Sequence, residues 1–103
     1  MRFIKPSSLN KESFILDVRS EQEHNIEKLN LPHVCKELKD LNPIEFIKEN
    51  NLTSDDTINI ICSSGARASQ AAEMFENIGF KNVSVVIGGL AEAEYEGLEV
   101  IKH

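Results

Sequence analysis

The stretch that decides the fold runs Ile58-Asn59-Ile60-Ile61-Cys62-Ser63-Ser64-Gly65-Ala66-Arg67-Ala68-Ser69. Its first part is apolar and rich in β-branched residues, which is typical of a buried strand. The run ends on Cys62, a loop of small and hydroxylated residues follows, and a helical pattern then begins. The free N–H groups of a first helical turn carry partial positive charge and favour an anion. Cysteines in such settings have a pKa of roughly 3.5–7.5 instead of about 8.5, so Cys62 is predicted to be a reactive thiolate.

The composition is that of an ordinary globular chain. With 103 residues, 41% of them hydrophobic and 27% charged, it is predicted to form one domain over residues 1–103. The net charge of −6 argues against nucleic acid as a partner. No apolar run is long enough for a membrane helix, and no signal peptide opens the chain. Two cysteines without a C-x-x-C pair indicate neither a disulfide framework nor a zinc site, so we expect a cytoplasmic protein without metal or cofactor.

Strand and helix patterns alternate along the chain, which predicts an α/β fold with a largely parallel sheet. Strands are predicted at 14–18, 58–61 and 82–87, with a loop or edge strand at 30–36. Helices are predicted at 21–27, 43–49, 68–78 and 90–96. Ser20 and Asn42 are the predicted N-caps of the first two, and Glu23 stands at the capping-box position. The predicted apolar helix faces are Ile44, Phe46 and Ile47, and then Ala68, Ala71, Ala72 and Phe75.

The loop after Cys62 is suited to an anion. Gly65 allows a sharp turn, Ser63 and Ser64 add donors, and Arg67 brings a permanent cation. A buried cysteine is often only a small apolar residue, but none of these neighbours helps core packing. Cysteine-dependent phosphatases place five residues between cysteine and arginine, whereas four lie between Cys62 and Arg67. The tighter loop favours a smaller species, such as the terminal sulfur of a persulfide.

Five motifs in order resemble those of a single-domain rhodanese, the sulfurtransferase family. The segment Cys62–Ala68 resembles the family's C-R-S-G-x-R-[AS] loop, and Leu16–Glu23 resembles its L-[IL]-D-V-R-x-x-x-E segment. Three shorter matches follow the loop: Gly79–Val83 with G-F-x-N-V, Gly88–Leu90 with G-G-[ILM], and Gly97–Val100 with G-L-P-V. The similarity covers nearly the whole chain.

The resemblance implies a central five-stranded parallel sheet flanked by helices on both faces. The cysteine loop would lie at the carboxyl edge of the central strand, where open α/β sheets bind ligands. Cys62 would be the nucleophile that takes sulfur from a small donor as a persulfide and passes it to a thiol or cyanide acceptor. Gly65 would supply the turn, and Arg67 would stabilise the loop or meet the donor's anion. The persulfide would be stabilised by the N–H groups of Ser63, Ser64, Gly65, Ala66, Arg67 and Ala68.

Two departures from the family pattern bear on the donor. The family loop often has arginine after the cysteine, where this chain has Ser63, so we expect weaker use of thiosulfate than of an organic or protein persulfide. The segment Ile26–Val34 is closer to the I-x-x-L-P-H-[AS] stretch of rhodanese domains fused to sulfur-carrier adenylyltransferases. This resemblance suggests a sulfur-carrier protein as a partner. Two alternatives stay open: a non-catalytic protein-binding module, and a cysteine-dependent phosphatase or arsenate reductase.

Several polar residues outside the loop have a structural and a functional interpretation. Asp17 and Arg19 end a strand near the expected loop, and we favour an ion-pair support over substrate contact. Cys35 is interpreted as an incidental thiol rather than a resolving one, and His33 as a solvated or hydrogen-bonded side chain rather than a base. His24 gives no functional signal. An acidic run is interpreted as a solvated helix face rather than a docking surface: Glu92, Glu94, Glu96 and Glu99.

Overall fold

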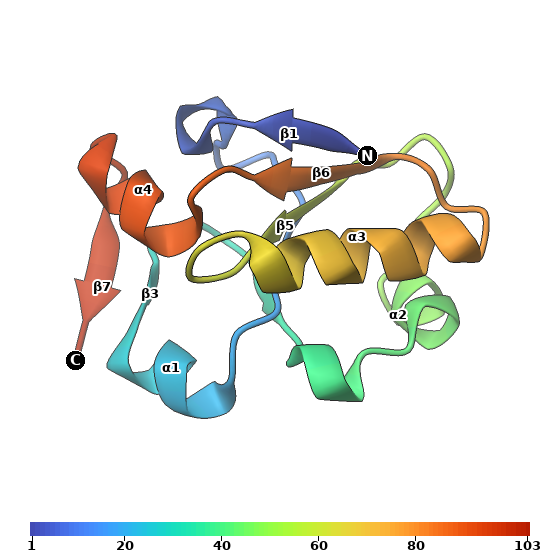
Figure 1. The fold of residues 1–103 in the computed structure, drawn as a ribbon, viewed down its shortest axis with the longest axis horizontal. Helices are drawn as coiled ribbons and strands as arrows, with labels where there is room; N and C mark the ends of the chain where they lie inside the picture. The colour runs from blue at the N-terminus through green and yellow to red at the C-terminus, as the bar shows by residue number, and fades with distance from the viewer.

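A central sheet lies between helices in the computed structural model, which describes residues 1–103 (Figure 1). The strand order is β1-β6-β5-β2-β4, and every neighbouring pair is parallel. These strands are β1 (Arg2–Ile4), β2 (Ile15–Asp17), β4 (Val34–Cys35), β5 (Ile58–Ile61) and β6 (Val83–Val86). The predicted five-stranded parallel sheet is therefore confirmed, with the cysteine-bearing strand β5 at its centre.

The first two helices begin where their capping residues predict, and the third and fourth begin two residues and one residue earlier than predicted. They are α1 (Glu21–Ile26), α2 (Pro43–Glu49), α3 (Ala66–Asn77) and α4 (Gly89–Tyr95), with short 3-10 turns η1 (Pro6–Ser8) and η2 (Leu38–Asp40). Ser20 and Glu23 form the predicted capping box of α1. The Asn42 side chain caps α2 by accepting a hydrogen bond from the backbone N–H of Glu45. None of the helices is both long enough and apolar enough to span a membrane.

One face of the sheet is covered by α2 and α3. The sheet side chains that point to this face include Leu16, Ile58, Ile60, Val83 and Val85, and the helices contribute Phe46, Ala68, Ala71, Ala72 and Phe75. Ala68, Ala71 and Ala72 of α3 are fully buried, so this helix packs closely on the central strands. The prediction that Ile44 belongs to the apolar face of α2 is wrong, because Ile44 is 52% exposed while Phe46 and Ile47 take the positions against the core.

The opposite face is covered by α4, η1 and a second sheet that the sequence did not reveal. This sheet is antiparallel and pairs β3 (Glu27–Leu29) with β7 (Val100–Lys102). Its three-residue strands are too short to show a period of two, and β1 escaped prediction for the same reason. The core on this side consists of Leu9, Ile15, Leu29, Ile61, Val86, Leu90 and Ala93.

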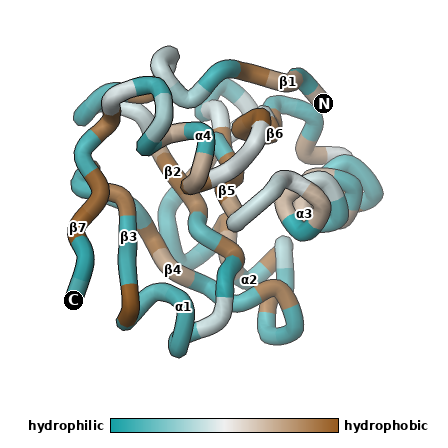
Figure 2. The backbone as a smooth tube through the Cα atoms, turned by 60° about the vertical axis from the view of Figure 1, so that its left-hand side comes forward, coloured by the Kyte–Doolittle hydropathy of each residue, from teal (hydrophilic) through white to brown (hydrophobic).

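Helix α1 differs from the other helices because it buries no residue. Figure 2 shows it as hydrophilic along most of its length, in contrast to the apolar inner strands β2 and β5. Since apolar packing does not hold α1, its position depends on hydrogen bonds and ion pairs. Those contacts reach the loop that follows β5.

Candidate functional site

The thiol of Cys62 lies inside a tight loop between β5 and α3. Cys62 directly follows β5 and is 1% exposed. The backbone N–H of Gly65 donates a hydrogen bond to Cys62 Sγ at 2.9 Å. Gly65 has φ +113° and is the N-cap of α3, so the chain turns sharply here and enters the helix. This arrangement directs the start of a twelve-residue helix toward the sulfur.

The inner side of the loop rests against the start of α4. The N–H of Leu90 donates to the carbonyl oxygen of Cys62 at 2.8 Å. A side chain at Gly89, which has φ +62°, would place its Cβ 2.5 Å from the carbonyl carbon of Ser63 and closer still to the Cys62 oxygen. In the sequence the glycine pair stood out only as part of the family's G-G-[ILM] motif. In the structure, Gly89 allows the two backbones to touch.

The outer side of the loop is tied to α1 by Glu23. Arg67 donates two hydrogen bonds to this carboxylate, Nη1 to Oε1 at 2.7 Å and Nη2 to Oε2 at 2.9 Å. The hydroxyl of Ser63 also donates to Glu23 Oε2 at 2.9 Å, and Arg67 Nη2 donates to Ser63 Oγ at 3.2 Å. Of the two roles expected for Arg67, this geometry favours loop stabilisation, because a carboxylate already engages the guanidinium in a bidentate pair.

The charges of this cluster are mutually stabilised. The hydrogen bonds from Arg67 hold the pKa of Glu23 well below its usual range, with Ser20 and Ser63 adding to the effect against a cost from burial. In return, Glu23 raises the pKa of Arg67. Sequence analysis identified Glu23 through its capping box and its place in the family segment, but not its contact with the loop. The Glu23 side chain caps α1 and also holds the loop, since Oε1 accepts from the backbone N–H of Ser20 at 3.1 Å as well as from Arg67.

The pair Asp17 and Arg19 lies one step behind this cluster. Both side chains are 2% exposed, and Arg19 Nη2 lies 2.9 Å from Asp17 Oδ2. Arg19 Nη2 also donates to the carbonyl oxygen of Glu27 at 2.8 Å, and Nη1 donates to that of Glu23 at 3.4 Å. The pair thus joins the end of β2 to the carboxyl end of α1. Its hydrogen bonds go to α1 and not to the cysteine loop, as expected of a support.

The remaining loop residues are placed differently. Ser64 and Ala66 are exposed, whereas Ala68 is buried in the core. Among the six predicted N–H donors of the loop, the Gly65 N–H is the one hydrogen-bonded to Sγ. A shallow hollow of about 260 Å³ lies beside the loop, and its lining includes Ser64, Gly65, Ala66, Ser69, Phe3 and Ile87.

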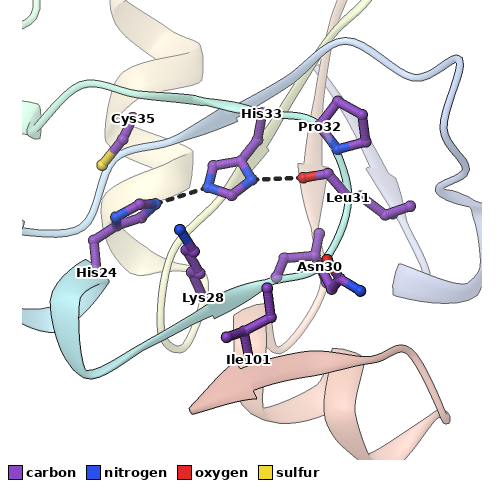
Figure 3. Close-up of a pocket in the computed structure, with 9 residues that line it drawn as sticks. His24, Lys28, Asn30, Leu31, Pro32, His33, Cys35 and Ile101 are labelled. Carbon is purple, nitrogen blue, oxygen red and sulfur yellow. Dashed lines mark hydrogen bonds between the residues drawn. The ribbon is translucent and has the colours of Figure 1, made fainter. Parts of the chain in front are cut away.

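The largest cavity, of about 470 Å³, does not touch the cysteine loop; it lies between the end of α1, β3 and the segment that leads into β4 (Figure 3). Cys35 is exposed at its edge, and partial burial together with the Asp17 carboxylate raises the pKa of this thiol. A raised pKa favours the interpretation as an incidental thiol. His33 is hydrogen-bonded, to Leu31 and to His24, rather than placed near Cys62.

Comparison with known proteins identifies the family. The family model described as Rhodanese-like domain matches residues 5–95. The chain is 38% identical over 78 residues to the "Putative sulfur carrier protein YrkF" of Bacillus subtilis (strain 168), a match covering 76% of this chain. The aligned region covers 40% of that relative, so the chain spans about two fifths of the relative's length.

Solved structures agree with the family match. The rhodanese-like domain protein of Staphylococcus aureus is 25% identical with TM-score 0.75, and the alignment covers 100% of both chains. A rhodanese-related protein of Thermoplasma volcanium is 26% identical with TM-score 0.78, and the alignment covers 98% of both chains. The chain therefore belongs to the rhodanese-like domain family.

Proposed function

We propose that this protein is a sulfurtransferase that carries sulfane sulfur as a persulfide on Cys62. The observation that carries the proposal is the cysteine thiol enclosed by the turn into α3, with the Gly65 N–H donating to Sγ at 2.9 Å. Family membership supports a role in sulfur transfer in general. The name of the Bacillus relative, a sulfur carrier protein, supports the same class of cargo.

The reaction proceeds by double displacement. The Cys62 thiolate attacks the outer sulfur of the donor, a new S–S bond forms, and the donor leaves as a thiolate or, from thiosulfate, as sulfite. An acceptor thiolate or cyanide then attacks the outer sulfur of the persulfide and releases the Cys62 thiolate. The transferred sulfur atom keeps its oxidation state in both steps, so the reaction requires no redox cofactor.

The loop N–H groups stabilise the negative charge of the persulfide. The first N–H groups of α3 have no partners within the helix and provide a preorganised electrostatic environment. Cys62 is buried, so the outer sulfur is accommodated when the loop residues 63–65 move outward. Glu23 and Arg67 restrain that movement, because they tie Ser63 and the first turn of α3 to α1.

The charge pattern favours a persulfide donor over thiosulfate. Arg67 is neutralised by Glu23, and Ser63 stands where the family often has a second arginine. A dianionic donor therefore meets no unpaired loop cation at the mouth of the site. A small organic persulfide, or the persulfide of a partner sulfur-carrier protein, fits this site better.

The donor preference is tested by introducing the missing cation. Ser63→Arg is expected to lower the KM for thiosulfate, measured in steady-state kinetics with cyanide as acceptor. Ser64→Arg is the matched control, because Ser64 lies in the same loop, is exposed, and makes no hydrogen bond to Glu23. An unchanged KM in Ser63→Arg would show that the cation at this position does not determine donor choice.

The transfer itself is tested by intact-protein mass spectrometry after incubation with a persulfide donor. We expect the mass of one added sulfur atom, which is lost with a thiol reductant or cyanide and is absent in Cys62→Ala. Cys35→Ser is the control, and it should gain the sulfur normally. If no donor adds sulfur, the protein is a binding module on this fold; hydrolysis of an aryl phosphate by Cys62 would instead indicate a phosphatase.

A further inference from the structure

Two histidines face each other in the largest cavity, which includes no residue of the cysteine loop. His24 is on the last turn of α1, and His33 is in the segment between β3 and β4. Their Nε2 atoms are 2.8 Å apart, and both side chains are half-buried (Figure 3). The two residues are nine positions apart in the sequence, a spacing that fits no familiar metal-binding motif.

The His33 ring has the tautomer that a metal ligand requires at Nε2. Its Nδ1 donates to the carbonyl oxygen of Leu31 at 2.7 Å, so its Nε2 carries the lone pair and accepts a hydrogen bond from the Nε2–H of His24 at 2.8 Å. A second-shell hydrogen bond of this kind to a backbone carbonyl fixes the tautomer of metal-binding histidines and raises their basicity. The His24 ring can present Nε2 as an acceptor as well, once its proton moves to Nδ1.

The surrounding charges are mixed. A carboxylate oxygen of Asp17 lies within 4.8 Å of a ring nitrogen of each histidine, which favours a cation. Both Asp17 oxygens already accept from Arg19, so Asp17 contributes negative charge rather than a ligand atom. Lys28 also lines the cavity and points toward the histidines, which opposes a cation (Figure 3).

We propose that His24 and His33 bind a divalent transition metal ion of the zinc type. Imidazole nitrogen is a ligand that zinc favours, and water would complete the coordination in the open cavity. Zn–N bonds of about 2.0–2.1 Å at a tetrahedral angle require the two nitrogens to be about 3.3 Å apart, so they must separate by about 0.5 Å, and the rings must turn so that both lone pairs point at the ion. His24 is half-buried on a helix that packs no apolar side chain, and this small movement is open to it.

Affinity is measured by competition between untagged protein and a chromophoric zinc chelator. We expect one Zn²⁺ per chain, with affinity reduced about tenfold or more in His24→Gln and in His33→Gln. Cys62→Ser and Cys35→Ser are controls and should leave the affinity unchanged, because neither sulfur is a ligand. Lys28→Gln should strengthen binding by roughly threefold, since it removes a nearby positive charge.

A second readout identifies the ligands directly. The chain has three histidines, and Zn²⁺ should shift the imidazole NMR signals of His24 and His33 while those of His103 stay in place. Zn²⁺ should also raise the midpoint of thermal unfolding of the wild-type protein but not of His33→Gln. Affinity unchanged in both histidine variants, or lost in Cys62→Ser or Cys35→Ser, would overturn the proposal. So would zinc-dependent shifts confined to His103.

Discussion

The inner and outer sides of the cysteine loop are held by different kinds of contact. On the inner side, the Cys62 carbonyl accepts from Leu90, and Gly89 packs directly on the loop backbone. On the outer side, Ser63 and Arg67 are tied to Glu23, which sits on a helix with no buried residue. The inner side is thus set by close packing, and the outer side by charge.

The difference separates the contacts that fix the position of the Cys62 sulfur from those that can modify its reactivity. Backbone packing tolerates almost no change of volume, because protein interiors are close-packed. A partly exposed ion pair such as Glu23 and Arg67 contributes less to stability, but it sets the charge seen by an incoming donor. The polar side nevertheless depends on a buried anchor, the pair formed by Asp17 and Arg19.

The largest expected loss of stability comes from that anchor. Asp17→Asn leaves the Arg19 guanidinium buried without its counter-charge, and removal of one partner of a buried pair costs about 3–5 kcal/mol. Urea unfolding of the purified variant measures the change in free energy. The matched control is Lys39→Gln, which removes the exposed ion pair with Glu37, 3.6 Å apart. The control should cost less than about 1 kcal/mol, and equal losses would show that Asp17 anchors nothing.

The next largest effect tests the packed side. Gly89→Ala forces a Cβ against the backbone of Cys62 and Ser63, at a residue with φ +62°. Overpacking and strain together are expected to lower the free energy of unfolding by about 2–4 kcal/mol and to abolish persulfide formation. Gly97→Ala has a similar backbone cost, at φ +95°, but its Cβ would meet no atom within 4 Å. If both variants lose the same stability, contact with the loop is not what requires Gly89.

Much of this fold follows from local signals in the sequence. The apolar run of β5 and the N-caps Ser20 and Asn42 predict their elements because each depends on residues close in the chain. The short strands β1, β3 and β7 could not be predicted in this way. Their pairing partners are distant, and three residues with mixed exposure carry no periodic pattern.

In the candidate site, too, the residues that are close in sequence could be predicted and the long-range contact could not. Cys62, Gly65 and Arg67 fall within one loop, and their spacing points to a cysteine cradle. The contact between Glu23 and Arg67 joins residues 44 positions apart, and it exists because β2 and β5 are neighbours in the sheet. The neighbouring sequence therefore predicts only a capping role for Glu23, whereas the structure shows that it also holds Ser63 and Arg67.

A smaller effect, on reactivity, tests the polar side. Glu23→Gln leaves the charge of Arg67 uncompensated beside the thiol and weakens the ties on Ser63 and α3. Both changes favour an accessible thiolate, so alkylation of Cys62 by iodoacetamide is expected to be about tenfold faster. Peptide mass analysis follows Cys62, with the exposed Cys35 as an internal reference. Glu21→Gln on the same helix is the matched control; a rate unchanged in Glu23→Gln would mean that the carboxylate does not restrain the loop.

The smallest expected effect is the pH dependence of stability. Arg67 keeps the pKa of Glu23 lower in the folded protein than in the unfolded chain, where it is near 4.3. Above that value the carboxylate is ionised in both states, and the full contribution to stability is present. As the pH falls further, the unfolded chain binds the proton first, so the contribution decreases.

Urea unfolding of wild type and Glu23→Gln at several pH values isolates this contribution, because all other carboxylates are common to both proteins. At pH 7 the wild type should be more stable by less than about 1 kcal/mol, since both partners of the pair are partly exposed and screened by solvent. The difference should shrink steadily below about pH 4.3. A difference that stays constant or grows toward low pH would mean that the ionised Glu23 does not stabilise the fold, and the outer side of the loop would then act on reactivity alone.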